Sequence, residues 1–155
     1  MNTNERVSLA AVGGAAAGVG LVFGLREADK QLAKSYISAK ASNASTTPPL
    51  LMKQLGNFGS PSAIGGIGVG IGSLAFGLYG AHKGKYLRTP DAQVAVSSFG
   101  GAALTTGVIS GIMPTSEWSS AVATDPSNGI GFNRSAKMTI GGARSSPALA
   151  YVNTA

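Results

Sequence analysis

The chain of 155 residues has room for one ordinary domain, and its composition excludes several classes of protein. Only 12% of the residues are charged, glycine occupies 23 positions and the mean hydropathy is +0.20, which excludes a disordered polar chain. Because it has no cysteine and only one histidine, His82, it cannot form a disulfide framework or a thiolate zinc site. The net charge of +6 favours an anionic neighbour, either phospholipid or nucleic acid.

Three long stretches contain no Asp, Glu, Lys or Arg: residues 7–25, 63–81 and 94–113. Their lengths of 19, 19 and 20 residues match the roughly 20 residues that a helix needs to cross a hydrocarbon layer of about 30 Å. The first stretch is expected to remain as an uncleaved helix, because Glu5 precedes it and no small-residue cleavage pattern follows it. The sequence therefore predicts an all-α membrane protein with three glycine-rich transmembrane helices.

Helix-boundary residues stand at the ends of these stretches. Ser60 precedes Pro61, and Thr89 precedes Pro90, so each pair offers a capping hydroxyl followed by a proline suited to the first helical turn. Pro114 would block continuation of the third helix. These residues predict where the second and third helices begin and where the third ends.

A soluble protein is the competing interpretation, because Gly and Ala make each stretch only marginally hydrophobic. In the second stretch, residues 66–72 alternate glycine with Ile or Val at a period of two, which suits a buried β element. The same residues resemble the glycine-rich helix of rotor-ring subunits in rotary ATP synthases. That family also needs a mid-membrane carboxylate, and no stretch here contains one, so the resemblance implies no proton carriage.

Small residues recur four positions apart within the three stretches. This spacing places them on one face of a helix, where the missing side chains allow another backbone to approach closely. Several such rows predict several helix neighbours, and therefore a subunit of something larger. The predicted helix-packing residues are Gly14, Gly18, Gly20, Gly24, Gly66, Gly70, Gly72, Gly77, Ala103, Gly107 and Gly111.

The charged segments between the stretches are predicted to lie outside the membrane. Residues 26–40 have the charge spacing of a polar helix that continues the first span, with Glu27 and Asp29 on its outer surface. Five basic residues adjoin the spans on one side and four on the other, so their count does not orient the chain. The residues expected to face lipid head groups or other anions are Lys30, Lys34, Lys83, Lys85 and Arg88.

The segment after Pro114 is polar and is predicted to be mostly irregular. Trp118, the only tryptophan, is expected to anchor at the level of the lipid head groups. Altogether the sequence divides into the N-terminus and first span (1–25), a polar helix and loop (26–62), the second span (63–81), a basic loop (82–93), the third span (94–113) and an extramembrane tail (114–155).

Catalytic and cofactor-binding motifs are missing from the sequence. The six carboxylates all lie outside the spans in no pairing that requires a shared site, His82 has no orienting acid near it, and the phosphate-loop pattern fails around Gly84 and Lys85. We therefore expect no enzymatic activity, no cofactor, no metal and no small-molecule substrate.

The expected function is that of a structural subunit in a virion internal membrane or in a complex of a bacterial or organellar inner membrane. Its partners would be the phospholipid bilayer and other membrane subunits or copies of itself, with a capsid or nucleic acid nearby. The alternative is an oligomeric pore, such as a holin or a genome-delivery channel. Its lumen would be lined by hydroxyls of the third span: Ser97, Ser98, Thr105, Thr106 and Ser110.

Overall fold

The computed structural model describes residues 2–83 and 87–124, and the regular structure within these ranges is entirely helical. Three helices are long and apolar enough to cross a membrane, which confirms the predicted all-α class and the predicted three helices of membrane-spanning length within the described residues. The β alternative for residues 66–72 is wrong, because these residues lie inside a helix. The elements are α1 (Thr3–Ser42), α2 (Leu50–Leu55), the 3-10 helix η1 (Gly56–Gly59), α3 (Pro61–Lys83), α4 (Pro90–Ile112) and α5 (Ser116–Ala123).

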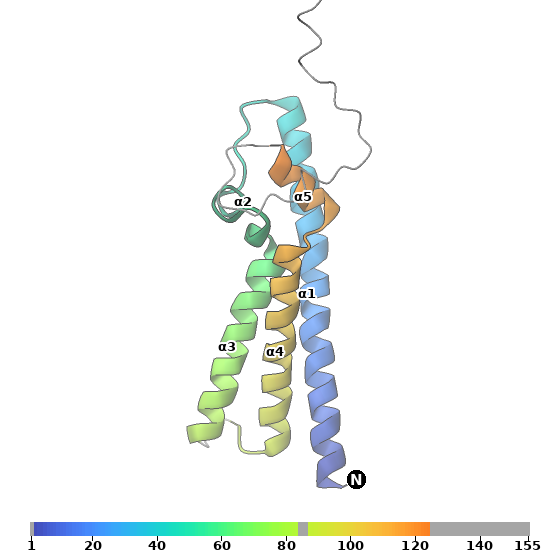
Figure 1. The fold of residues 1–155 in the computed structure, drawn as a ribbon, viewed down its shortest axis with the longest axis vertical. Coiled ribbons are helices and arrows are strands. Elements are labelled where there is room, and N and C mark those ends of the chain that lie inside the picture. The colour runs from blue at the N-terminus through green and yellow to red at the C-terminus, as the bar shows by residue number, and fades with distance from the viewer. Residues whose placement is uncertain (1, 84–86, 125–155) are drawn as a thin grey trace, which may run out of the picture.

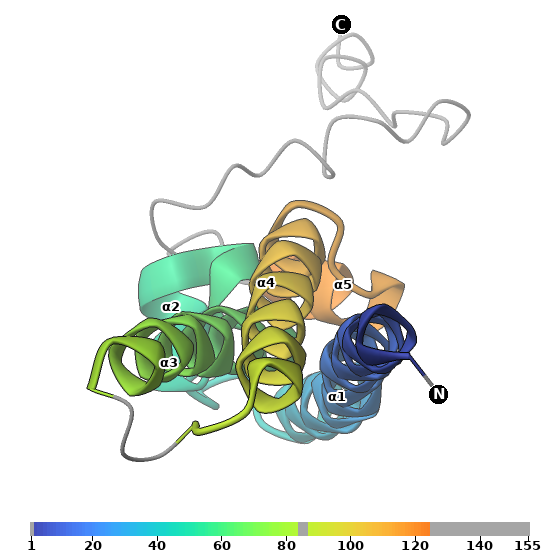
Figure 2. The same cartoon turned by 90° about the horizontal axis from the view of Figure 1, so that it is seen from below.

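The three long helices run side by side, and α4 lies between α1 and α3 (Figures 1 and 2). The short elements α2, η1 and α5 gather at one end of this bundle, around the part of α1 that extends past the other two long helices (Figure 1). We call this end the head and define it as residues 26–59 and 114–124. The N-terminus lies at the opposite end, where α3 is followed by α4 (Figure 1).

The capping residues start α3 and α4 as predicted. The Ser60 hydroxyl accepts a hydrogen bond from the backbone N–H of Ala63 at 3.2 Å, and Thr89 accepts one from Ala92 at 3.4 Å. With the prolines in their first turns, both helices begin before the uncharged stretches predicted from residues 63 and 94. α4 ends at Ile112, two residues before Pro114, in agreement with the predicted stop.

The first span and the polar segment after it form one uninterrupted helix of 40 residues. At 1.5 Å per residue α1 is about 60 Å long, roughly twice the thickness of a hydrocarbon layer. Its N-terminus is fixed by a capping box, in which Asn2 accepts from the backbone of Asn4 and Glu5 accepts from the backbone of Asn2. α1 therefore links the membrane-length bundle rigidly to the head.

The head has its own apolar core, and Trp118 is at its centre. The Trp118 side chain is 1% exposed, and its indole N–H donates to the carbonyl oxygen of Gly56 at 3.2 Å. The predicted anchoring of Trp118 in the head groups is therefore wrong, because packing within the chain already buries the ring and satisfies its donor. The core comprises Ala33, Tyr36, Met52, Trp118, Ala121 and Val122.

The segment after Pro114 is also more ordered at its start than predicted. Thr115 caps α5 by accepting from the backbone N–H of Trp118 at 3.3 Å, and the resulting helix delivers Trp118, Ala121 and Val122 to the head core. The prediction of a mostly irregular tail did not specify this helix. The rest of that prediction, for residues 125–155, lies outside the described residues.

Asp29 was expected on the outer surface of α1 with Glu27, but its side chain is completely buried. One of its carboxylate oxygens accepts from the backbone N–H of Ser62 at 2.9 Å, and the other accepts from the Ser62 hydroxyl. Ser62 lies in the first turn of α3, where unpaired N–H groups and the helix dipole favour a negative charge. The carboxylate of α1 thus caps α3 at the boundary between bundle and head.

Candidate helix-packing site

The closest contacts between the long helices are made at glycine positions on α4 and its neighbours. An added Cβ at Gly14 would overlap the carbonyl oxygen of Ala95, and one at Gly18 would overlap that of Phe99. On the other side of α4, an added Cβ at Gly70 would meet the backbone of Leu104. α4 is therefore held between two glycine faces, one supplied by α1 and the other by α3.

At one crossing of α3 and α4, glycines of both helices meet: Gly66 of α3 and Gly107 of α4. A Cβ built on Gly107 would lie 2.7 Å from the carbonyl carbon of Gly66 and 2.7 Å from the backbone nitrogen of Ile67. Ala103 is fully buried next to this crossing. Since backbone atoms cannot rotate out of the way, α3 and α4 reach this separation only because both positions lack a side chain.

Two further predicted residues have close neighbours, Gly77 in the α3–α4 contact and Gly111 in a contact of α4 with η1. A Cβ at Gly77 would lie 2.8 Å from the Ser97 hydroxyl oxygen, and one at Gly111 would overlap the ring of Phe58 in η1. Gly100 belongs to the same contact although it was not among the predicted packing residues, because its Cβ would lie 2.8 Å from the backbone nitrogen of Leu74. Its distance of seven residues from Gly107, two helical turns, is the sequence signal that would have identified it.

Three of the predicted packing glycines make no close contact with another helix of the described chain: Gly20, Gly24 and Gly72. A Cβ added at any of them would have no atom within 4 Å among the described residues. The same holds for three further glycines in the spans: Gly13, Gly68 and Gly101. We call these six positions the outward glycines, since the fold leaves open space beside each of them.

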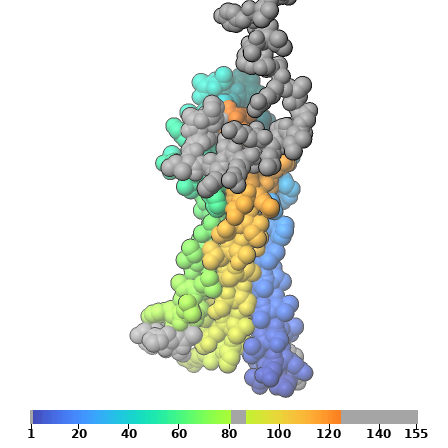
Figure 3. All heavy atoms as spheres, viewed as in Figure 1, coloured from blue at the N-terminus to red at the C-terminus, as the bar shows by residue number. Residues whose placement is uncertain are grey.

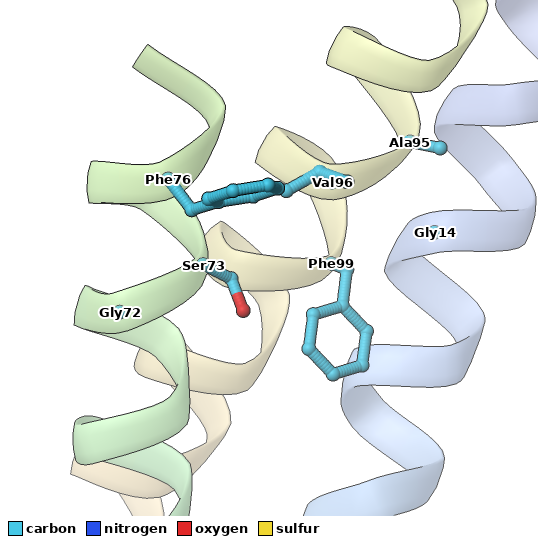
Figure 4. Close-up of a pocket in the computed structure, with 7 residues that line it drawn as sticks. All are labelled: Gly14, Gly72, Ser73, Phe76, Ala95, Val96 and Phe99. Carbon is cyan, nitrogen blue, oxygen red and sulfur yellow. The ribbon is translucent and has the colours of Figure 1, made fainter. Parts of the chain in front are cut away.

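An apolar groove of about 530 Å³ runs between α1 and α3 along α4. Figure 4 shows Gly14 of α1 on one side and Gly72 of α3 on the other, with the Phe76 ring reaching from α3 over α4 toward Val96. Ser73, Ala95 and Phe99 complete the lining. In the space-filling view the three helices form one elongated body beneath the head (Figure 3).

The predicted anion-facing residues do not form one cluster. Lys30 and Lys34 lie on the head portion of α1, whereas Arg88 is exposed just before α4, at the other end of the bundle. Lys85 and the side chain of Lys83 lie outside what the structure describes. Lys30 forms an ion pair with Glu27 at 2.6 Å, and this hydrogen bond and charge raise the pKa of Lys30 above its ordinary value.

The hydroxyls of α4 face different surroundings. Ser97 lies at the α3 contact, the Thr106 hydroxyl donates to the carbonyl oxygen of Ala102 in its own helix at 2.8 Å, and Thr105 is exposed. Ser110 is 1% exposed, and its hydroxyl has no hydrogen-bond partner among the described residues. These hydroxyls therefore do not line a common surface of one chain.

No family model, curated protein or solved structure matches this chain. The assignment of a function therefore depends on the chain's own geometry. Two features of that geometry are available as sites: the outward glycines with the adjoining groove, and the charged surface of the head.

Proposed function

We propose that this chain is a non-enzymatic structural subunit embedded in a membrane, which packs against other subunits or copies of itself through its outward glycines. The observation that carries the proposal is the division of the glycines into two sets. One set accounts for the close contacts of α4 with α1 and α3, and the other set faces open space. The second set has the composition of a helix interface but no partner within the described chain.

The outward glycines extend into stripes with exposed alanines. On α1, Gly13, Ala17, Gly20 and Gly24 are all exposed at the three- and four-residue spacing of one helical face. On α3, Gly68, Gly72 and Ala75 form a second exposed face. An interior glycine destabilises a helix by about 1 kcal/mol relative to alanine, so stripes that contacted only lipid would lower stability without a compensating contact. Close approach of another helix supplies that contact.

The groove between α1 and α3 supports the same proposal. Its floor on α4 and its small wall residues, Gly14 and Gly72, leave room for side chains of an added helix, which would convert the three-helix arrangement into a four-helix one. The occupant would come from another subunit or from a second copy. A virion internal membrane and an energy-transducing complex of a bacterial or organellar inner membrane are the two settings that suit such a subunit, with a capsid or nucleic acid near the basic surfaces in the first.

A non-enzymatic role is supported by how the described carboxylates are used. Glu5 belongs to the capping box of α1, Asp29 caps α3, and Asp91 forms an ion pair with Arg6 at 2.7 Å. Glu27 is paired with Lys30, and Glu117 accepts a hydrogen bond from the Ser116 hydroxyl at 3.0 Å. Each of these groups has a structural partner, and the part of the chain that the structure describes has no cluster of three potential metal ligands.

The test compares leucine substitutions at outward and ordinary exposed positions. Gly20→Leu and Gly72→Leu each place a side chain where no other described part of the chain lies. Both variants should therefore keep their helical circular dichroism and their resistance to carbonate extraction. They should lose cross-linked or co-purified membrane partners, because the added side chain blocks close approach. Val69→Leu, at an exposed position of α3 beside the stripe, is the matched control and should keep those partners.

Two results would overturn the proposal. Unchanged partners in both glycine variants would mean that the stripes are not interfaces, and carbonate release of the unaltered protein would mean that it is not integral to the membrane. Dye leakage from liposomes that contain the purified protein, abolished by Thr105→Leu, would favour the pore instead.

A further inference from the structure

A polar cleft of about 540 Å³ lies where α1 passes from its apolar span into the head. One wall is formed by Phe23, Arg26, Glu27 and Lys30 of α1. The other is formed by residues 114–117, which include the end of the link from α4 and the first two residues of α5. The cleft is separate from the apolar groove, and neither the packing of the helices nor the proposed function uses it. Because it lies at the end of the uncharged stretch, it falls at the level of the lipid head groups in a bilayer that α1 spans.

Arg26 is a cation of this cleft that has no carboxylate partner among the described residues. Its guanidinium donates to the carbonyl oxygen of Met113 at 2.9 Å and lies 5.9 Å from the centre of the Phe23 ring. The bond to Met113 uses one of its five N–H donors and fixes the group at the C-terminal end of α4. Within residues 2–83 and 87–124, no carboxylate forms an ion pair with Arg26.

The remaining charges of the cleft are one ion pair and one carboxylate. Lys30 and Glu27 neutralise each other at 2.6 Å. Glu117 forms no ion pair with any described residue. Hydrogen bonds from its own backbone and from Ser116 lower the pKa of Glu117, so it is ionised at neutral pH. The cleft therefore offers one cation, Arg26, and one anion, Glu117, to an occupant that carries both charges.

The apolar part of the cleft indicates which end of such an occupant lies deeper. Phe23 is 56% exposed at the end of the span, and Ile112 at the end of α4 and Met113 directly after it are also exposed. Acyl chains of a phospholipid would pass along these side chains, and its phosphate would follow at the level of Arg26, a residue type suited to bidentate phosphate contacts. A group beyond the phosphate would then reach the carboxylate of Glu117 at the start of α5.

We propose that this cleft is a binding site for a phospholipid with a zwitterionic head group that ends in a primary ammonium, as in phosphatidylethanolamine. The phosphate accepts hydrogen bonds from Arg26, and the ammonium donates to Glu117. A phosphatidylglycerol head group has no cation for Glu117, and the quaternary ammonium of phosphatidylcholine has no N–H to donate. This inference rests on the membrane placement in the proposed function and does not depend on the identity of the protein partners.

Native mass spectrometry of the full chain, extracted from vesicles with equal amounts of phosphatidylethanolamine, phosphatidylcholine and phosphatidylglycerol, provides the test. We expect phosphatidylethanolamine to be the most abundant bound lipid. Glu117→Gln should remove the discrimination between phosphatidylethanolamine and phosphatidylcholine. Arg26→Gln should lower the occupancy of both lipids by about tenfold, because a charge-assisted hydrogen bond of about 1.5 kcal/mol is lost. Lys53→Gln removes an exposed cation of α2 that does not line the cleft, so it should change neither the selectivity nor the occupancy.

Trp118 fluorescence shows whether each variant keeps a folded head, and Arg26→Lys replaces Arg26→Gln if the latter unfolds. The lysine keeps the charge but loses the bidentate geometry, so it should lower phosphatidylethanolamine occupancy less than tenfold. Equal occupancy by the three lipids, or unchanged selectivity in folded Glu117→Gln, would overturn the inference. So would displacement of the bound lipid by soluble glycerophosphoethanolamine at equal concentration, which would indicate a water-soluble ligand. Carbonate release of the unaltered chain would instead refute the membrane placement on which the proposed function depends.

Discussion

The crossing of Gly66 and Gly107 provides a sharp test of how this fold is held together. Gly107→Ala adds one methyl group that would lie 2.7–2.8 Å from three backbone atoms of Gly66 and Ile67. Ordinary contacts between such atoms lie at about 3.5–4.0 Å, so α3 and α4 must separate by about 1 Å. The control is Gly101→Ala in the same helix, where the added methyl has no atom within 4 Å among the described residues.

The pair of variants isolates the steric contribution to stability. Both substitutions gain the same helix propensity of about 1 kcal/mol, which cancels in the comparison. What remains is the effect of overpacking at Gly107, roughly 2 kcal/mol, or about a thirtyfold shift in the unfolding equilibrium. Gly107→Ala should therefore unfold at a lower mole fraction of SDS than Gly101→Ala when circular dichroism is followed in mixed micelles.

Equal unfolding midpoints for the two alanine variants would refute this reasoning. Such a result would mean that α3 and α4 do not approach each other at Gly107 as closely as the structure shows, or that the crossing adds nothing to stability. A Gly107→Ala variant that is more stable than Gly101→Ala would contradict it even more directly.

Two further predictions concern the boundary and the head. Asp29→Ala removes the carboxylate that accepts from the backbone N–H and the hydroxyl of Ser62 and leaves that buried N–H without an acceptor, so it should destabilise the chain by roughly 3 kcal/mol in the same SDS titration. Asp29→Asn retains an acceptor and should have a smaller effect. Trp118→Phe removes the hydrogen bond to Gly56 and part of the buried ring, so it should destabilise the head by about 2 kcal/mol. Faster tryptic cleavage after Lys34 and Lys53, with the helical content of the bundle unchanged, would show this loss, and an unchanged cleavage rate would contradict it.

The sequence predicted the membrane-length helices because their signals are local. The length of an uncharged stretch can be read from that stretch alone. The pairs Ser60–Pro61 and Thr89–Pro90 act within a single helical turn. α3 and α4 begin before the uncharged stretches because a capping residue and a proline start each helix, at Pro61 and Pro90. Such signals need no knowledge of what packs against the helix.

The burial of particular residues could not be predicted in the same way. Asp29 looks like a surface residue because its neighbours in the sequence are charged, and its burial depends on Ser62, 33 residues away. Trp118 follows a span as an interfacial anchor would, but the carbonyl that it meets belongs to Gly56, 62 residues earlier. Spacing by four identified small-residue faces, yet it could not show that Gly18 meets α4 while Gly20 faces open space.

Under the proposed function, the division between inner and outward glycines would account for the large number of glycines in the chain. α4 contacts α1 through Gly14 and Gly18 and contacts α3 through Gly66 and Gly70, so the glycine faces that hold it are occupied within the chain. The stripes on α1 and α3 face away from those contacts, and a partner helix can pack on either of them without displacing α4. Helices in a membrane associate by close packing rather than by escape from water, so a subunit that must fold and also assemble needs a separate small-residue face for each contact.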